Sequence, residues 1–181
     1  IMNSSYKQST LDYSDIFKLL IYMVNPKKVV EFGILDGYSL KIFADNCDND
    51  CKIEGYDIFE EFNGNGSNMD TLNKNFEKYE NIVIQYGDYY KIVENFDDNS
   101  IDILHIDIAN NGDVYKFAIE QYMKKVKKNG IIILEGGSKD RDNVEWMIKY
   151  NKPKFCDYLD TLNNKYHIID KFPSITVFKN V

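Results

Sequence analysis

The fold is decided by the stretch Lys28-Val29-Val30-Glu31-Phe32-Gly33-Ile34-Leu35-Asp36-Gly37-Tyr38-Ser39. Its first half is rich in β-branched and aromatic residues, which favour a strand. Gly33 and Gly37 then interrupt the chain before residues 39–44, which have the composition of a helix. The stretch therefore predicts a strand, a sharp turn and a helix in succession. In an open sheet built from such units, ligands bind beyond the carboxyl ends of the strands.

The same alternation continues along the chain. Residues 131–135 are apolar on both faces, which predicts a central strand, and Pro173 lies between two late strands that could form a terminal hairpin. Alternating strands and helices indicate an α/β fold with a mostly parallel sheet and helices on both faces. We expect one domain over 1–181, with an N-terminal helical segment at 1–26 and a core at 27–181. The remaining strands are expected at 52–57, 81–86, 100–107, 165–170 and 174–178, and the helices at 10–24, 69–79, 114–128 and 140–150.

Composition restricts the partners. The 181 residues include 22 Lys and Arg against 29 Asp and Glu, a net charge of −7. Such a chain repels phosphate backbones and acidic lipids, so we expect neither a nucleic-acid nor a membrane partner. No secretory signal is visible in residues 1–5, and Cys47, Cys51 and Cys156 are few and odd in number. These features favour reduced thiols and a cytoplasmic location.

A carboxylate ends each of the first five predicted strands: Glu31, Asp57, Asp88, Asp107 and Glu135. The turn after the first strand is neither G-x-G-x-x-G nor a P-loop, which disfavours a pyrophosphate pocket. Helix N–H groups near Gly37 would favour a carboxylate, and Glu31 could hold an ammonium group. A ligand with both an amine and a carboxylate fits this turn.

Two further strand ends could bind an additional part of this ligand. Asp57 follows the turn by about 20 residues, the spacing of a carboxylate that binds ribose hydroxyls. Asp88, beside Gly87, could accept a hydrogen bond from an adenine amino group. The sequence thus describes a site for an amino acid joined to a nucleoside.

The first turn, Asp57 and Gly87-Asp88, together with 102–107 and Asn129-Gly130-Ile131, resemble the motifs of class I S-adenosylmethionine-dependent methyltransferases. The resemblance covers roughly residues 10–180. The 104–107 stretch is similar to a subgroup of that family that acts on sugars and other small molecules. The resemblance implies a Rossmann-like, seven-stranded sheet whose last strand is antiparallel, with S-adenosylmethionine as the cofactor. It places Asp57 at the ribose, Ile58 on the adenine and Asp107 near the methionine amine and the substrate. The methionine part would be surrounded by Glu31, Gly33, Tyr38 and Ser39, and the adenine edge flanked by Gly87 and Asp88.

Transfer to a hydroxyl also needs deprotonation, by a base or through a metal. The candidates are Asp107, Glu135 and His105. Many members of the subgroup carry a histidine shortly after the aspartate, and this chain has none there. Catechol-type relatives hold a divalent cation. Asp107 and Glu135 match two of its ligands, which with waters could bind Mg²⁺, but Gly136 stands where an asparagine would be.

Several side chains keep a structural alternative. His105 could be a packed, hydrogen-bonded histidine, and Glu135 could cap the next helix. Arg141 could bind an anionic substrate or pair with acids in the region of Asp140.

We therefore expect an S-adenosylmethionine-dependent methyltransferase, of the EC 2.1.1 type, acting on a small molecule at a hydroxyl of the sugar or natural-product type. No added substrate domain is visible, so the acceptor is small or a second subunit completes the pocket, which leaves a homo-oligomer open. The alternatives are a catalytically silent cofactor-binding module and a nucleotide-dependent oxidoreductase.

Overall fold

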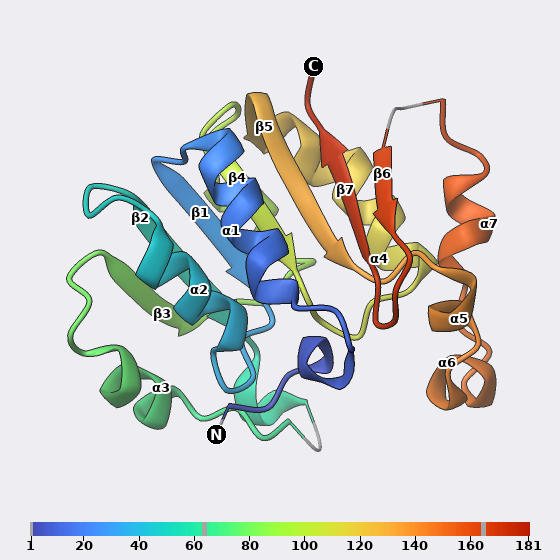
Figure 1. Ribbon diagram of the computed structural model, residues 1–181, viewed down its shortest axis with the longest axis horizontal. Helices are drawn as coiled ribbons and strands as arrows, with labels where there is room; N and C mark the ends of the chain where they lie inside the picture. Colours follow the sequence, from blue (N-terminus) through green and yellow to red (C-terminus); the bar gives the residue numbers. More distant parts are fainter. Residues whose placement is uncertain (1, 63–64, 164–165) are drawn as a thin grey trace.

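A seven-stranded sheet forms the centre of the computed structural model, which describes residues 2–62, 65–163 and 166–181 (Figure 1). The strand order is β3-β2-β1-β4-β5-β7-β6. The first five strands are parallel, while β7 runs antiparallel to both β5 and β6. This confirms the predicted sheet and its antiparallel C-terminal hairpin. The strands are β1 Lys28–Phe32, β2 Lys52–Asp57, β3 Ile82–Tyr86, β4 Ile101–Ile106, β5 Val126–Glu135, β6 Tyr166–Ile169 and β7 Ile175–Lys179.

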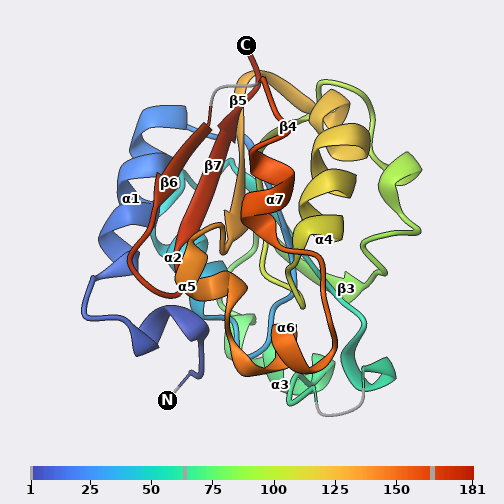
Figure 2. The same ribbon diagram turned by 90° about the vertical axis from the view of Figure 1, so that its right-hand side faces the viewer.

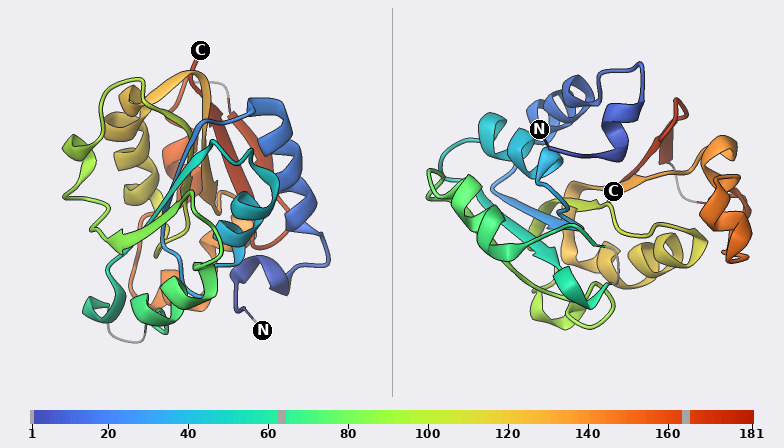
Figure 3. Two further views of the ribbon diagram at one scale, coloured as in Figure 1. Left: turned by 90° about the vertical axis from the view of Figure 1, so that its left-hand side faces the viewer. Right: turned by 90° about the horizontal axis from the view of Figure 1, so that it is seen from below.

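Helices cover both faces of the sheet, as the view from below shows (Figure 3). On one face, α1 Tyr13–Val24, α2 Tyr38–Asn46 and α3 Met69–Phe76 bury side chains such as Phe17 and Phe43. On the other, α4 Gly112–Phe117 and α7 Phe155–Leu159 pack around Phe32 and Tyr122. None of the helices in the described ranges has the length and apolar character needed to cross a membrane.

Local signals fix the ends of α1. The Asp12 side chain accepts a hydrogen bond from the Ser14 N–H at 2.9 Å, which satisfies a donor that the helix itself leaves unpaired. The helix stops where Asn25 adopts a left-handed conformation, with Pro26 following. The helix predicted over 10–24 is observed from Tyr13, three residues after its predicted start, because Asp12 caps it there. A separate short helix, η1 Ser5–Gln8, precedes it.

The predicted helix over 114–128 is wrong only in its last three residues. After α4 the chain stays helical through the π-helix η4 Ala118–Tyr122 and the 3-10 helix η5 Met123–Lys125, and β5 begins at Val126. Lys125 is buried and pairs with Glu94 and Asp98. These partners come from another segment, so the periodicity of 114–122 could not reveal them.

The predicted helix over 140–150 is broken into α5 Lys139–Asp142 and α6 Glu145–Lys149 (Figure 2). The break follows from Asp142, whose buried carboxylate accepts the Phe155 N–H at 2.6 Å and the Cys156 N–H at 3.1 Å. Asp142 thus caps α7, which the sequence did not predict. At the sheet edge formed by β6, the strand expected over 165–170 is observed as Tyr166–Ile169, and Lys165 lies outside the described residues.

Candidate cofactor and acceptor site

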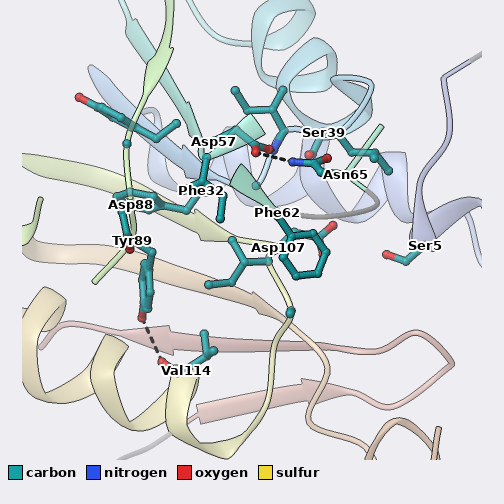
Figure 4. Close-up of a pocket in the computed structure, with 18 of the residues that line it drawn as sticks. Ser5, Phe32, Ser39, Asp57, Phe62, Asn65, Asp88, Tyr89, Asp107 and Val114 are labelled. Carbon is teal, nitrogen blue, oxygen red and sulfur yellow. Dashed lines mark hydrogen bonds between the residues drawn. The ribbon is translucent and has the colours of Figure 1, made fainter. Parts of the chain in front are cut away.

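A cavity of about 520 Å³ opens at the carboxyl ends of β1, β2 and β4 (Figure 4). Three residues of the N-terminal segment, Asn3, Ser4 and Ser5, form part of its wall. Glu31 and Gly37 do not line it. The structure brings together at this cavity eight residues predicted to bind the cofactor: Gly33, Tyr38, Ser39, Asp57, Ile58, Gly87, Asp88 and Asp107.

The Asp57 carboxylate is held in place by three donors. Its Oδ2 accepts the Ile34 N–H at 2.8 Å, and its Oδ1 accepts the Phe59 N–H and the Asn65 side-chain amide, each at 2.8 Å. The turn after β1 and the segment after β2 therefore converge on one side chain. Asn65 lines the same cavity and was not predicted, because only its fold position, eight residues after Asp57, brings it there.

The two glycines of the first turn serve different contacts. Gly33 has φ of 86°, and a Cβ added there would lie 2.1 Å from the Asp107 carbonyl oxygen, so this position admits the close approach of the two strand ends. Gly37 has φ of 82°, and its added Cβ would meet the Phe76 ring at 2.6 Å. Gly37 thus permits α2 and α3 to pack, at a distance from the cavity surface.

His105 lies beneath the site in a buried chain of hydrogen bonds. Its Nδ1 is 2.9 Å from Glu31 Oε2, and its Nε2 is 2.9 Å from the Tyr6 hydroxyl. With Nδ1–H donating to the Glu31 carboxylate, Nε2 accepts the Tyr6 O–H. Burial, followed by the charges of Asp107, Glu135 and Glu31, raises the pKa of Tyr6 well above its usual value, which keeps this hydroxyl a donor. These hydrogen bonds hold η1, and with it the cavity wall formed by residues 3–5, against the sheet.

A second cavity of about 640 Å³ adjoins the first, and Ser5, Asp107 and Ile108 line both. Its other walls include Glu135, Arg141 and Trp146. The arrangement suits two ligands whose reacting groups meet at Asp107.

Glu135 and Arg141 form a two-pronged ion pair in the second cavity. Arg141 Nε donates to Oε1 at 2.7 Å and Nη2 donates to Oε2 at 3.0 Å, and both side chains are buried. The guanidinium also lies 5.3 Å from the Trp146 ring centre and 5.4 Å from that of Phe155. The structure pairs Arg141 with Glu135 and not with the acids around Asp140.

The electrostatics single out Asp107. Burial raises the pKa of Asp107 well above its usual value, and the negative charges of Glu135 and Glu31 add to the effect against the opposing charge of Arg141. Burial also raises the pKa of Glu135, although the Arg141 hydrogen bond and charge lower it. Asp107, which has no guanidinium partner, is thus a stronger base than an ordinary carboxylate.

The residues here do not fit a divalent cation. Both oxygens of Glu135 already accept from Arg141, and the guanidinium places a positive charge in the cavity. Across the described ranges, no group of three His, Cys, Asp or Glu side chains is arranged to hold a metal ion. A hard cation wants several free oxygens, and the Asp107–Glu135 pair does not offer them.

The comparisons with known proteins agree with this geometry. A family model described as O-methyltransferase matches residues 3–154. The chain belongs to the O-methyltransferase family. A Dictyostelium discoideum protein described as probable caffeoyl-CoA O-methyltransferase 3 is 24% identical over 135 residues, which are 74% of this chain and 53% of the relative. This member of the family therefore spans about half the length of that relative.

Solved structures show the same fold. A candidate caffeoyl-CoA O-methyltransferase from Staphylococcus aureus is 22% identical, with a TM-score of 0.71 over 99% of this chain and 93% of the other. The O-methyltransferase TomG from Streptomyces achromogenes, solved in complex with SAM, is 12% identical, with a TM-score of 0.70 over 99% and 82% of the two chains. These neighbours confirm the Rossmann-like methyltransferase fold of this family member.

Proposed function

We propose that this protein transfers the methyl group of S-adenosylmethionine to a hydroxyl of a small molecule. The observation that carries the proposal is the cavity at the strand ends, which is lined by Asp57 and Asp88, the residues predicted to contact the ribose and the adenine. Membership of the O-methyltransferase family supports it, as does the bound SAM of the similarly folded TomG. The adjoining cavity is of a size for a small acceptor.

The cofactor would supply an activated methyl group on a sulfonium, so the protein has mainly to align the acceptor with it. Asp57, immobilised by its three donors, would accept from the ribose hydroxyls through the lone pairs that remain. Gly87 and Asp88 would border the adenine, and Tyr38 and Ser39 the methionine part.

We assign the base to Asp107. It lies where the two cavities meet and its pKa is raised. The acceptor hydroxyl would give its proton to the Asp107 carboxylate while its oxygen bonds to the methyl carbon, and the carbon–sulfur bond breaks to leave a neutral thioether. Glu135 is engaged by Arg141, and His105 lines neither cavity, so both act through other residues.

Binding of S-adenosylhomocysteine, measured by calorimetry with NAD as the control, tests the proposal. We expect binding of the homocysteine adduct, no binding of NAD, and no change when Mg²⁺ is added. Preference for NAD would favour the oxidoreductase alternative. Binding without turnover on any hydroxyl acceptor of a broad panel would favour the silent cofactor-binding module.

The type of acceptor, the location in the cell and self-association stay predictions. The net charge of −7 continues to favour a small-molecule acceptor over a nucleic acid. We infer a cytoplasmic location from the sparse cysteines, and leave self-association to measurement of the mass in solution.

A further inference from the structure

The chain carries a single arginine, and that arginine lies in the second cavity. Arg141 is the one arginine among 22 basic residues, so every other cation of the chain is a lysine. Arg141 is 7% exposed, whereas Lys149, at the same cavity, is exposed. A guanidinium differs from an ammonium in its planar fork of donors, which matches carboxylates and other planar oxygen anions.

The surroundings of Arg141 fix this fork and leave part of it unsatisfied. Glu135 takes Nε and Nη2, and the rings of Trp146 and Phe155 lie near the guanidinium. The remaining nitrogen, Nη1, is buried and has no hydrogen-bond partner among the described residues. A buried donor without a partner is unfavourable, and an oxygen that reaches it is bound all the more strongly because the donor is charged.

The rest of the cavity indicates what kind of molecule carries that oxygen. Trp146, Tyr150, Phe172 and Pro173 provide flat, largely apolar walls, and Asp107 stands at the boundary with the cofactor cavity. Walls of this kind suit an aromatic ring. An acceptor that fills the cavity would place its ring against them, an anionic group toward Arg141 and its hydroxyl toward Asp107.

We propose that Arg141, held by Glu135, binds an anionic oxygen of the acceptor in the place that a divalent cation takes in metal-dependent methyltransferases, and that the acceptor is an aromatic hydroxy acid. This inference rests on the proposed function, since it names the substrate class of the same site. Arg141 becomes the residue that determines specificity, and Glu135 a positioning residue that orients it.

The test compares 2-hydroxybenzoate with its neutral analogue 2-hydroxybenzamide as probes. Both are titrated by calorimetry into protein saturated with S-adenosylhomocysteine. We expect the acid to bind at least about tenfold more tightly than the amide, because the amide cannot supply the charge that the guanidinium needs. Equal affinities, or no measurable binding of either probe, would overturn the assigned substrate class.

Matched variants separate Arg141 from general charge. Arg141→Gln should abolish the preference for the acid. Lys149→Gln removes the same charge from an exposed position of the cavity and should retain it, since exposed charges contribute little. Because Arg141→Gln leaves Glu135 buried without its partner, a Glu135→Gln/Arg141→Gln double variant removes both charges together. A preference that survives in the double variant while S-adenosylhomocysteine still binds would overturn the proposal.

Metal binding provides an independent readout. Titration of Mn²⁺ into the same S-adenosylhomocysteine-loaded protein should give no binding at this site. Stoichiometric Mn²⁺ binding that Asp107→Asn abolishes would overturn the proposal that Arg141 takes the role of the cation. Failure of the unchanged protein to bind S-adenosylhomocysteine at all would instead count against the proposed function, so the two failures are distinguishable.

Discussion

Tyr6→Phe tests whether the buried hydrogen-bond chain holds the N-terminal segment against the cofactor cavity. The variant removes one oxygen, which donates to His105 Nε2 at 2.9 Å, and leaves that nitrogen buried without a partner. An unmade buried hydrogen bond costs about 1–3 kcal/mol. For a chain of this size each kcal/mol lowers Tm by about 2–4 °C. The affinity for S-adenosylhomocysteine should fall as well, because the segment supplies Asn3, Ser4 and Ser5 to the cavity wall.

Urea unfolding and calorimetry measure the two effects on the same sample. Tyr22→Phe is the matched control, since Tyr22 is 84% exposed. We expect the control to match the parent protein in both assays. The role of this hydrogen bond in holding the segment would be refuted if Tyr6→Phe lowered the free energy of unfolding by less than about 0.5 kcal/mol and left the affinity unchanged. A loss that small lies below the cost of an unmade buried hydrogen bond.

Three further substitutions address the site itself. Asp57→Ala leaves the Ile34 and Phe59 N–H groups unpaired, so the affinity for S-adenosylhomocysteine should fall at least about tenfold and the free energy of unfolding by about 2–4 kcal/mol; calorimetry that shows parental affinity would contradict the assigned ribose contact. Asp107→Asn removes a carboxyl whose folded-state pKa is raised, so the ionised form costs stability once the pH exceeds the unfolded pKa of about 3.9. The variant should therefore be more stable than the parent in urea at pH 8 and lose this gain as the pH falls toward 4, while its methyl transfer is impaired. Gly33→Ala combines a left-handed backbone with a 2.1 Å approach to the Asp107 carbonyl, which should cost about 2–5 kcal/mol, whereas Gly66→Ala, with open space around it, should leave the urea midpoint unchanged.

Much of the fold could be predicted because its determinants are local. The alternation of apolar runs and turns gave the parallel strands, and the carboxylates that end them mark one edge of the sheet. The errors arose where distant residues decide. Lys125, the last residue of η5, pairs with Glu94 and Asp98 from a distant segment, and Asp142 at the end of α5 caps α7.

The site was predictable to the same extent. Asp57 and Asp107 follow directly from their places at strand ends, and both line the first cavity. The surroundings of His105 and Glu31 could not be read in this way, because their partner Tyr6 stands 99 residues from His105 in the chain. Likewise Asn65 and the Asn3–Ser5 wall carry no motif, and only the folded chain brings them to the cavity.

The solitary, shielded guanidinium also gives the molecule a built-in chemical reporter. A dicarbonyl reagent that modifies arginine has one target in the whole chain, so each labelled molecule gains a single mass increment. Arg141 is 7% exposed and paired with Glu135, so the reagent approaches it through the second cavity, which Arg141 lines. The labelling rate therefore measures access to this cavity, and any molecule that occupies the cavity slows the labelling.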